Sequence, residues 1–241
     1  ELMAGKHVVL STPTGSGKSL VATGLFFKAL SEGKTAYYTC PIKALVNEKF
    51  FAFCELFGPE RVGLMTGDAS INRTAPLVCC TAEILANIAL RDRSARVDYV
   101  VMDEFHYYAD RERGVAWQIP LLCLNDATFL LMSATLGDTR SIERGIEERT
   151  KRPFASVRGT TRPVPLNYEY RDTPLHETIA ELVSGGRAPV YLVNFTQRAA
   201  AEEAKNLRSV DSGTRAEKEA NKVAMTDVAG TKAVGKERQG L

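Results

Sequence analysis

The sequence predicts an α/β fold in which helices flank a mostly parallel sheet. Through the first 150 or so residues, short apolar runs alternate with longer amphipathic segments, which is typical of β-α-β units. Several of the apolar runs show no polar alternation, as expected for strands that are covered on both faces. The chain has 241 residues, 44% of them hydrophobic and 25% charged, which is enough for a core and for one large domain or two ordinary ones.

The individual elements follow from these apolar runs and from the residues that end them. Strands are expected over His7–Thr12, Thr35–Cys40, Val62–Met65, Leu77–Cys80, Tyr99–Met102 and Thr128–Met132. Lys18–Leu30 predicts a largely apolar core helix that ends at Gly33, because glycine commonly terminates helices. Ile42–Phe57 predicts a second helix with one apolar face, so its phenylalanines are expected in the core rather than on a binding surface.

A change in composition near residues 159–173 predicts a boundary between two domains, because Gly159, Pro163 and Pro165 interrupt this stretch. We expect a first domain over residues 1–158, a linker over 159–173 and a partial second domain over 174–241. In this last part, helices are expected over Leu175–Val183 and Gln197–Leu207 and a strand over Val190–Phe195. Residues 212–241 are polar and show no strand pattern.

The composition argues against several classes of protein. The 5 cysteines are odd in number and form no C-x-x-C pair, and the 3 histidines are widely spaced, so neither a disulfide framework nor a zinc site is expected. No apolar run approaches the ~20 residues that span a bilayer, and no signal-peptide pattern opens the chain. We therefore expect a soluble cytoplasmic protein with no membrane partner. The net charge of +2 permits an anionic partner without naming one.

A phosphate-binding loop is predicted between the first strand and the first helix. The segment from Thr12 to Ser19, TPTGSGKS, follows an apolar strand and opens a helix. In this context the backbone N–H groups point at a phosphate, Lys18 reaches the β- and γ-phosphates, and the Ser19 hydroxyl binds Mg²⁺. Thr12 stands where the general motif has its first glycine. The residues expected to bind the nucleotide are Thr14, Gly15, Ser16, Gly17, Lys18 and Ser19.

Two consecutive carboxylates complete the predicted nucleotide site. Asp103 and Glu104 follow the apolar strand Tyr99–Met102, and ligands of open α/β sheets bind at the carboxyl ends of the strands. We expect Asp103 to organise Mg²⁺ together with Ser19 and Glu104 to polarise the attacking water, with Lys18 as the third catalytic residue. The combination predicts an enzyme that hydrolyses a nucleoside triphosphate.

The segment Asp103-Glu104-Phe105-His106 resembles the DExH box of superfamily 2 helicases. The phosphate loop of that family, A/T-x-T-G-x-G-K-[ST], accommodates Thr12. Further segments that match family motifs in the expected order are Pro41–Leu45, Gly63–Asp68, Thr81–Leu85 and Ser133–Thr135. The residues after the DExH box, Tyr107-Tyr108, Arg113-Gly114 and Trp117, are most similar to the superkiller-like branch, particularly its bacterial members.

The resemblance implies a RecA-like domain followed by the start of a second one. It also implies an ATP-dependent motor that uses ATP and Mg²⁺ and moves 3′ to 5′ on single-stranded RNA or, less often, DNA. The residues that it implies for coupling hydrolysis to movement are His106, Ser133 and Thr135. The residues expected to contact the nucleic acid are Pro41, Lys43, Thr66, Gly67, Asp68, Thr81 and Glu83, at strand-to-helix turns where backbone groups grip phosphates irrespective of sequence.

The resemblance covers residues 1 to about 210 and weakens after that, where the chain departs from the family pattern. Phe195–Arg198 resembles the motif that opens the second RecA-like domain, but the Q-x-x-G-R-x-G-R element has no counterpart in Ser212–Leu241. An incomplete chain with weak nucleotide binding and poor turnover of its own is therefore expected. Two alternatives remain open: a DNA repair helicase, and a nucleotide- and nucleic-acid-binding module without turnover. The sequence predicts neither protein partners nor an oligomeric state.

Overall fold

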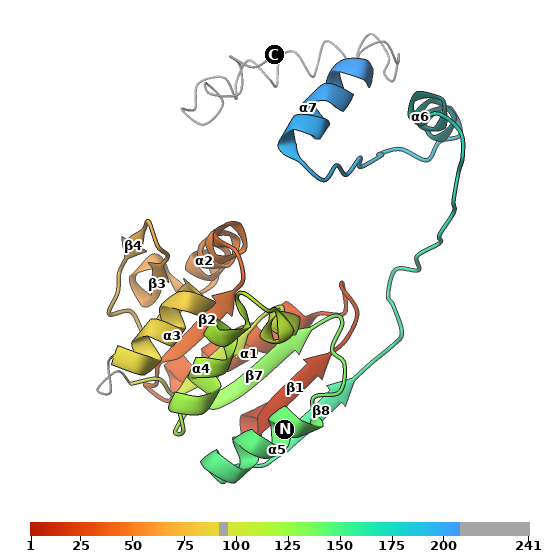
Figure 1. The fold of residues 1–241 in the computed structure, drawn as a ribbon. Coiled ribbons are helices and arrows are strands. Elements are labelled where there is room, and N and C mark those ends of the chain that lie inside the picture. The colour runs from red at the N-terminus through yellow and green to blue at the C-terminus, as the bar shows by residue number, and fades with distance from the viewer. Residues whose placement is uncertain (92–95, 208–241) are drawn as a thin grey trace. The chain divides into compact units, whose positions relative to one another are not determined.

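The computed structural model describes residues 1–91 and 96–207, which fall into two units divided between Leu166 and Asn167. In the first unit an 8-stranded sheet has the order β4-β3-β5-β2-β6-β7-β1-β8 (Figure 1). The strands are β1 (His7–Ser11), β2 (Ala36–Cys40), β3 (Val62–Met65), β4 (Ser70–Ile71), β5 (Leu77–Thr81), β6 (Tyr99–Met102), β7 (Thr128–Ser133) and β8 (Phe154–Arg158). All neighbouring pairs except β3 and β4 are parallel, which confirms the predicted fold class.

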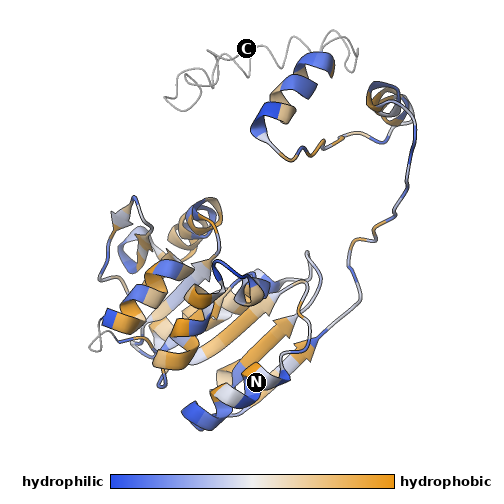
Figure 2. Ribbon diagram, viewed as in Figure 1, coloured by the Kyte–Doolittle hydropathy of each residue, from blue (hydrophilic) through white to orange (hydrophobic). Residues whose placement is uncertain are grey.

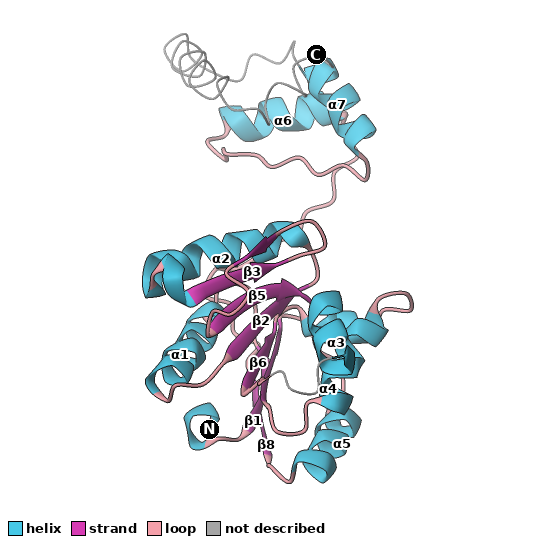
Figure 3. Cartoon of the chain, turned by 90° about the vertical axis from the view of Figure 1, so that its left-hand side faces the viewer, coloured by secondary structure: helices cyan, strands magenta, loops and turns pink. Residues whose placement is uncertain are grey.

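Helices cover both faces of this sheet, as Figure 3 shows. The helices α1 (Lys18–Ser31) and α2 (Lys43–Phe57) lie on one face, and α3 (Ala82–Arg91), α4 (Gly114–Cys123) and α5 (Arg140–Thr150) lie on the other. Short 3-10 helices are η1 (Leu2–Ala4), η2 (Pro59–Arg61) and η3 (Phe105–Ala109). In the described ranges, no helix is both long and apolar enough to cross a membrane.

Covering both faces explains why the strands lack polar alternation. Along β1, the side chains of Val8 and Leu10 pack into the core beneath α1 and α2, while Val9 packs into the core beneath the other helices. Central strands such as β7 are accordingly coloured as hydrophobic along most of their length in Figure 2, because neither set of alternate side chains faces water. The edge strands β4 and β8 are partly exposed, so their apolar signal is weak and the sequence did not predict them.

Helix α1 is less buried than its apolar sequence predicts. Only Ala22, Leu25, Phe26 and Ala29 are buried, whereas Leu20 and Phe27 are exposed. The helix packs on the sheet through one face only, which corrects the expectation of a core helix. In α2 the expected apolar face is confirmed in part: Val46, Phe50 and Phe53 are buried, but Phe51 is exposed. Ile42, expected on this face, is the N-cap and is also exposed.

The second unit contains two helices in its described residues, α6 (Leu175–Ser184) and α7 (Gln197–Asn206). The strand predicted over Val190–Phe195 is not formed, and the side chains of Tyr191 and Phe195 are exposed. A lone strand has no neighbour to supply its hydrogen bonds, which is the physical reason for the difference. Residues 212–241, predicted to be polar without strands, lie outside the described residues, and the predicted domain boundaries remain predictions.

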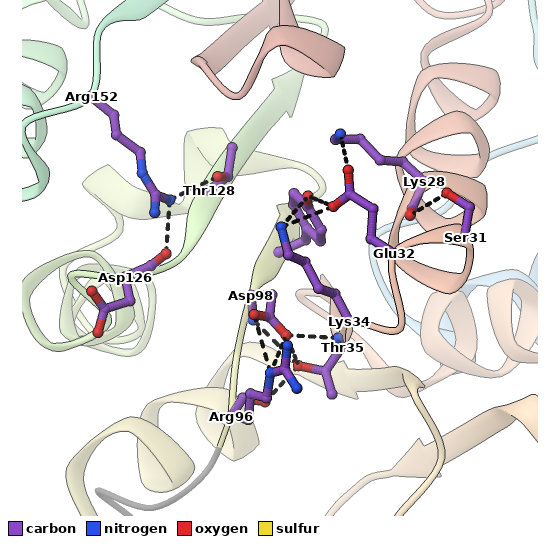
Figure 4. A network of polar contacts seen from close by, with 11 residues as sticks. Lys28, Ser31, Glu32, Lys34, Thr35, Arg96, Asp98, Asp126, Thr128 and Arg152 are labelled. Atoms are coloured by element: carbon purple, nitrogen blue, oxygen red, sulfur yellow. Dashed lines mark hydrogen bonds and ion pairs between the residues drawn. The ribbon is translucent and has the colours of Figure 1, made fainter.

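The amino ends of the strands are tied together by a polar network, drawn in Figure 4. Glu32, at the end of α1, accepts hydrogen bonds from Lys28, from Lys34 and from the Tyr99 hydroxyl at 2.5 Å. The Lys28 and Tyr99 hydrogen bonds, with a further one from Lys34, lower the pKa of Glu32 to about 2. Asp98 accepts from the backbone N–H of Thr35 at 2.9 Å. The polar groups at this edge therefore satisfy one another.

We expect the buried His7 to make the stability of the fold depend on pH. Its Nδ1 accepts a hydrogen bond from the backbone N–H of Phe129 at 3.0 Å, so Nε2 carries the proton and donates to Thr150 Oγ1 at 2.8 Å. Burial, reinforced by the charge of Arg152, lowers the pKa of His7 from 6.5 to about 4. The unfolded chain therefore takes up this proton first, and stability is lost as the pH falls from 6.5 towards 4.

Denaturation midpoints measured between pH 7 and pH 4 test this expectation. A His7→Phe variant should be less stable at neutral pH but should lose less stability on acidification than the wild type. His176→Gln, at an exposed histidine of the second unit, is the matched control and should follow the wild type. Equal acid sensitivity of His7→Phe and the wild type would show that His7 is not responsible.

Candidate functional site

The predicted nucleotide residues lie at the carboxyl edge of the sheet. The phosphate loop follows β1, the carboxylate pair follows β6, and Ser133 ends β7. Leu10 pairs with Met132 and Met102 pairs with Leu131, so the three parallel strands end almost level. However, β7 lies between β1 and β6, so the strands that precede Lys18 and the carboxylates are not adjacent. Two strand spacings, about 10 Å, separate the backbones of β1 and β6, a distance that a lysine and a triphosphate span together.

The loop before α1 has the backbone conformation that a phosphate site requires. Gly15 and Gly17 have φ angles of +84° and +89°, in the left-handed region that favours glycine. Thr12 Oγ1 and Ser16 Oγ are hydrogen-bonded at 2.6 Å, which closes the loop on itself. Gly17 is the N-cap of α1 and no side chain caps the helix, so its first N–H groups remain available to an anion.

Lys18 lies across the loop that it follows. Its Nζ donates hydrogen bonds to the carbonyl oxygens of Thr12 at 2.7 Å and Pro13 at 3.1 Å. The amine is thereby held above the turn that contains the two left-handed glycines. Thr14 and Ser19, on either side of these glycines, are exposed.

Asp103 is oriented by a residue that the sequence did not single out. The hydroxyl of Tyr38, in β2, donates a hydrogen bond of 2.6 Å to Asp103 Oδ2, and the backbone N–H of Glu104 donates to Oδ1 at 3.0 Å. Burial and the neighbouring Asp103 charge raise the pKa of Tyr38, which keeps the phenol protonated and donating. In the sequence Tyr38 is only one apolar residue of a strand, so no local signal could have identified this role.

Glu104, His106 and Ser133 meet at the start of η3. Glu104 has a φ of +53°, a conformation that is unusual for a residue other than glycine. His106 Nδ1 lies 3.3 Å from Glu104 Oε2 and 3.0 Å from Ser133 Oγ, and Ser133 Oγ accepts from the backbone N–H of Thr135 at 3.2 Å. The structure therefore connects the carboxylate pair to the end of β7 through direct contacts.

The residues expected to contact nucleic acid follow β2, β3 and β5, which are neighbours in the other half of the sheet. Lys43 Nζ lies 3.0 Å from Asp68 Oδ1, and Thr66 Oγ1 donates to the same oxygen at 2.8 Å. Gly67 and Asp68 lie in a turn between β3 and β4 rather than before a helix, which corrects the expectation. Thr66 forms this turn, because its Oγ1 also accepts from the backbone N–H of Ala69 at 3.1 Å.

The carboxylate of Glu83, at the start of α3, is bound by Arg113. Arg113 Nε and Nη2 donate to Glu83 Oε1 at 3.0 and 2.6 Å, and Nη2 also donates to the carbonyl oxygen of Pro41. Partial burial would raise the pKa of Glu83, but the hydrogen bonds from Arg113 hold it below its ordinary value. Thr81 is buried at the end of β5. Arg113 appeared in the sequence only as part of a family resemblance, without a role.

Asp103 and Ser19 supply oxygen atoms of the kind that bind a magnesium ion. Mg²⁺ takes oxygen ligands, and in nucleotide sites it uses one or two protein groups together with substrate phosphates and water. The Asp103 carboxylate and the Ser19 hydroxyl are donors of that kind. Over residues 1–91 and 96–207 no group of three or more His, Cys, Asp or Glu side chains could hold a metal by itself. The Asp103 carboxylate and the Ser19 hydroxyl are therefore the candidate protein ligands for such an ion.

A comparison with models of protein families identifies the family of this chain. Residues 1–143 match the family model described as DEAD/DEAH box helicase. The chain belongs to the DEAD/DEAH box helicase family. The match contains the phosphate loop, the carboxylate pair and Ser133 to Thr135, and it confirms the resemblance drawn from the motifs.

Curated relatives support the same family. The chain is 37% identical over 177 residues to the chloroplastic DExH-box ATP-dependent RNA helicase DExH15 of Arabidopsis thaliana. This alignment covers 70% of this chain and 15% of that protein. It is 38% identical over 175 residues to the probable helicase HelY of Mycobacterium tuberculosis, covering 68% and 18%. It is 36% identical over 168 residues to the antiviral helicase SKI2 of Saccharomyces cerevisiae, and this alignment covers 68% of this chain and 13% of that protein. The matched part thus spans less than a fifth of these relatives.

Solved structures support the fold. The helicase MrfA superposes with a TM-score of 0.65 at 18% identity, covering 99% of this chain and 39% of that chain. The helicase Lhr of Mycobacterium smegmatis, solved with single-stranded DNA and AMP-PNP, has a TM-score of 0.63 at 22% identity, covering 87% and 32%. These likenesses confirm the fold, a mostly parallel sheet with helices on both faces as in RecA-like domains.

Proposed function

We propose that this chain carries the nucleotide-binding core of an ATP-dependent helicase that moves on single-stranded nucleic acid, in the first place RNA. The observation that carries the proposal is the position of two sets of residues on one sheet edge. The phosphate loop, Asp103, Glu104 and His106 follow β1 and β6, and the elements containing Pro41, Thr66 and Glu83 follow β2, β3 and β5. Because both sets lie on one edge, a change of the bound nucleotide in one half can affect the residues that contact the nucleic acid in the other half.

In the proposed reaction, water attacks the γ-phosphorus of ATP and the bond from that phosphorus to the β–γ bridging oxygen breaks. Lys18 and the N–H groups at the start of α1 stabilise the phosphate charge, which spreads over the γ-phosphate oxygens in the transition state. Glu104 accepts the proton of the attacking water. A magnesium ion held by Ser19 and Asp103 would supply further charge neutralisation when it is bound with ATP.

Movement requires that the affinity for the strand differs between nucleotide states, because a ligand shifts a conformational equilibrium only through such a difference. His106 is the residue best placed to report the state of the nucleotide site, since it lies beside Glu104 and is hydrogen-bonded to Ser133. We propose that His106, Ser133 and Thr135 pass this state on to a second RecA-like domain, to which residues 174–241 contribute. Closure of the two domains on ATP and strand, followed by hydrolysis, would then advance the motor.

A comparison of nucleic acids tests the proposed substrate. In the natural protein that carries these residues, single-stranded RNA is expected to stimulate ATP hydrolysis more strongly than single-stranded DNA of equal length and sequence. Because the strand is gripped through its phosphates, binding should also weaken with salt, by a logarithmic slope of about −0.7 per phosphate contacted. Equal or stronger stimulation by DNA would favour the DNA repair helicase. Retained ATP binding with hydrolysis at background would indicate a binding module without turnover.

A further inference from the structure

Arg113 is fixed firmly to the segment that follows the DExH residues. Asp110 Oδ1 accepts hydrogen bonds from the backbone N–H groups of Glu112 at 2.9 Å and Arg113 at 2.7 Å. At Gly114 a Cβ atom would lie 2.5 Å from the carbonyl oxygen of Tyr108, so only glycine permits this contact between α4 and η3. The end of η3 and the backbone at Arg113 and Gly114 are therefore in direct contact.

The guanidinium of Arg113 reaches from this segment to two other elements. It donates to Glu83 at the start of α3 and to the carbonyl oxygen of Pro41, the residue after β2. The guanidinium carbon, Cζ, also lies 5.7 Å from the centre of the ring of Tyr107, a residue of η3. One planar cation thus contacts three elements that begin at the carboxyl ends of the neighbouring strands β5, β2 and β6.

The negative charge of Glu83 affects how this edge of the sheet can bind nucleic acid. A carboxylate repels the phosphates of a nucleic acid, and Arg113 neutralises this one at hydrogen-bond distance. The pair is half-exposed, so its strength depends on geometry more than on burial. Lysine could not reproduce it, because the contacts use two nitrogens of one planar group on two different acceptors.

We propose that Arg113 is a positioning residue that couples the nucleotide site to the strand-binding edge. When the turn at Glu104 and η3 changes with the state of the nucleotide, Arg113 moves the turn after β2 and the start of α3 with it. The two elements that are proposed to grip successive phosphates therefore change their spacing together. This inference rests on the proposed function and adds a residue and a direction of coupling to it.

ATP hydrolysis as a function of RNA concentration, in the natural protein that carries these residues, tests this inference. Arg113→Gln should raise the RNA concentration for half-maximal stimulation on the order of 10-fold, with hydrolysis in the absence of RNA close to that of the wild type. Arg113→Lys should recover only part of the loss. Arg111→Gln, at an exposed arginine two residues away, is the matched control and should behave as the wild type.

A double-mutant cycle with Glu83→Gln separates coupling from a general structural effect. If Arg113 acts through Glu83, the effects of the two substitutions on half-maximal stimulation should be clearly less than additive. Unchanged RNA dependence in Arg113→Gln, or an equal loss of hydrolysis with and without RNA, would overturn the inference. If Arg113→Gln fails to fold, Arg113→Lys decides by the same criteria. A wild type that RNA and DNA both fail to stimulate would instead refute the proposed function.

Discussion

Replacing Lys18 with alanine is expected to abolish ATP hydrolysis and to weaken ATP binding by roughly 10- to 100-fold. The amine is the charged donor of the phosphate loop, and hydrogen bonds to charged groups are worth about 1.5–3 kcal/mol each, where about 1.4 kcal/mol corresponds to tenfold in affinity. The fold should survive, because alanine is a good helix former at the start of α1 and the hydrogen bonds that Lys18 makes within the described residues go to carbonyl oxygens of its own loop.

Titration with a fluorescent ATP analogue and a phosphate-release assay measure the two effects of Lys18→Ala. Lys28→Ala is the matched control, because Lys28 lies on the same helix, about 15 Å along its axis from Lys18. It pairs with Glu32 at the opposite edge of the sheet and should leave both measurements near wild type. Wild-type turnover in Lys18→Ala would remove the phosphate loop from the mechanism.

Replacing Glu104 with glutamine should separate binding from hydrolysis. Glutamine keeps the size of the side chain and the turn at Glu104 but cannot accept the proton of the attacking water. We expect ATP affinity to stay close to wild type while hydrolysis falls by about 10²- to 10⁴-fold, the range for loss of a general base. The variant should therefore hold ATP and nucleic acid together without advancing.

Single-turnover hydrolysis of prebound ATP measures this step directly, because product release does not enter the observed rate. Glu112→Gln makes the same chemical change at an exposed site on the loop before α4, and we expect it to hydrolyse ATP at the wild-type rate. Hydrolysis by Glu104→Gln at the wild-type rate would contradict the proposed role. A loss of ATP affinity as large as that of Lys18→Ala would show that Glu104 acts in binding instead.

The parallel sheet was predictable because buried strands leave a direct record in the sequence. The central strands β5, β6 and β7 are apolar at nearly every position, since both of their faces are covered. The edge strands β4 and β8 were missed, because half-exposed strands carry mixed residues. The strand expected over Val190–Phe195 shows the opposite error: its residues favour a strand, but no neighbouring strand lies beside it in the described residues.

What the sequence determined by itself was local chemistry. The left-handed turns at Gly15 and Gly17, the lysine that follows them and the carboxylates after β6 depend on residues that are neighbours along the chain. Their shared edge also followed, because parallel strands present their carboxyl ends on the same side of a sheet. Only the tertiary structure decided that β7 separates β1 from β6, that Tyr38 orients Asp103, and that Arg113 binds Glu83 and Pro41. These contacts join residues far apart in the chain, and strand order and helix packing, which depend on the whole core, bring them together.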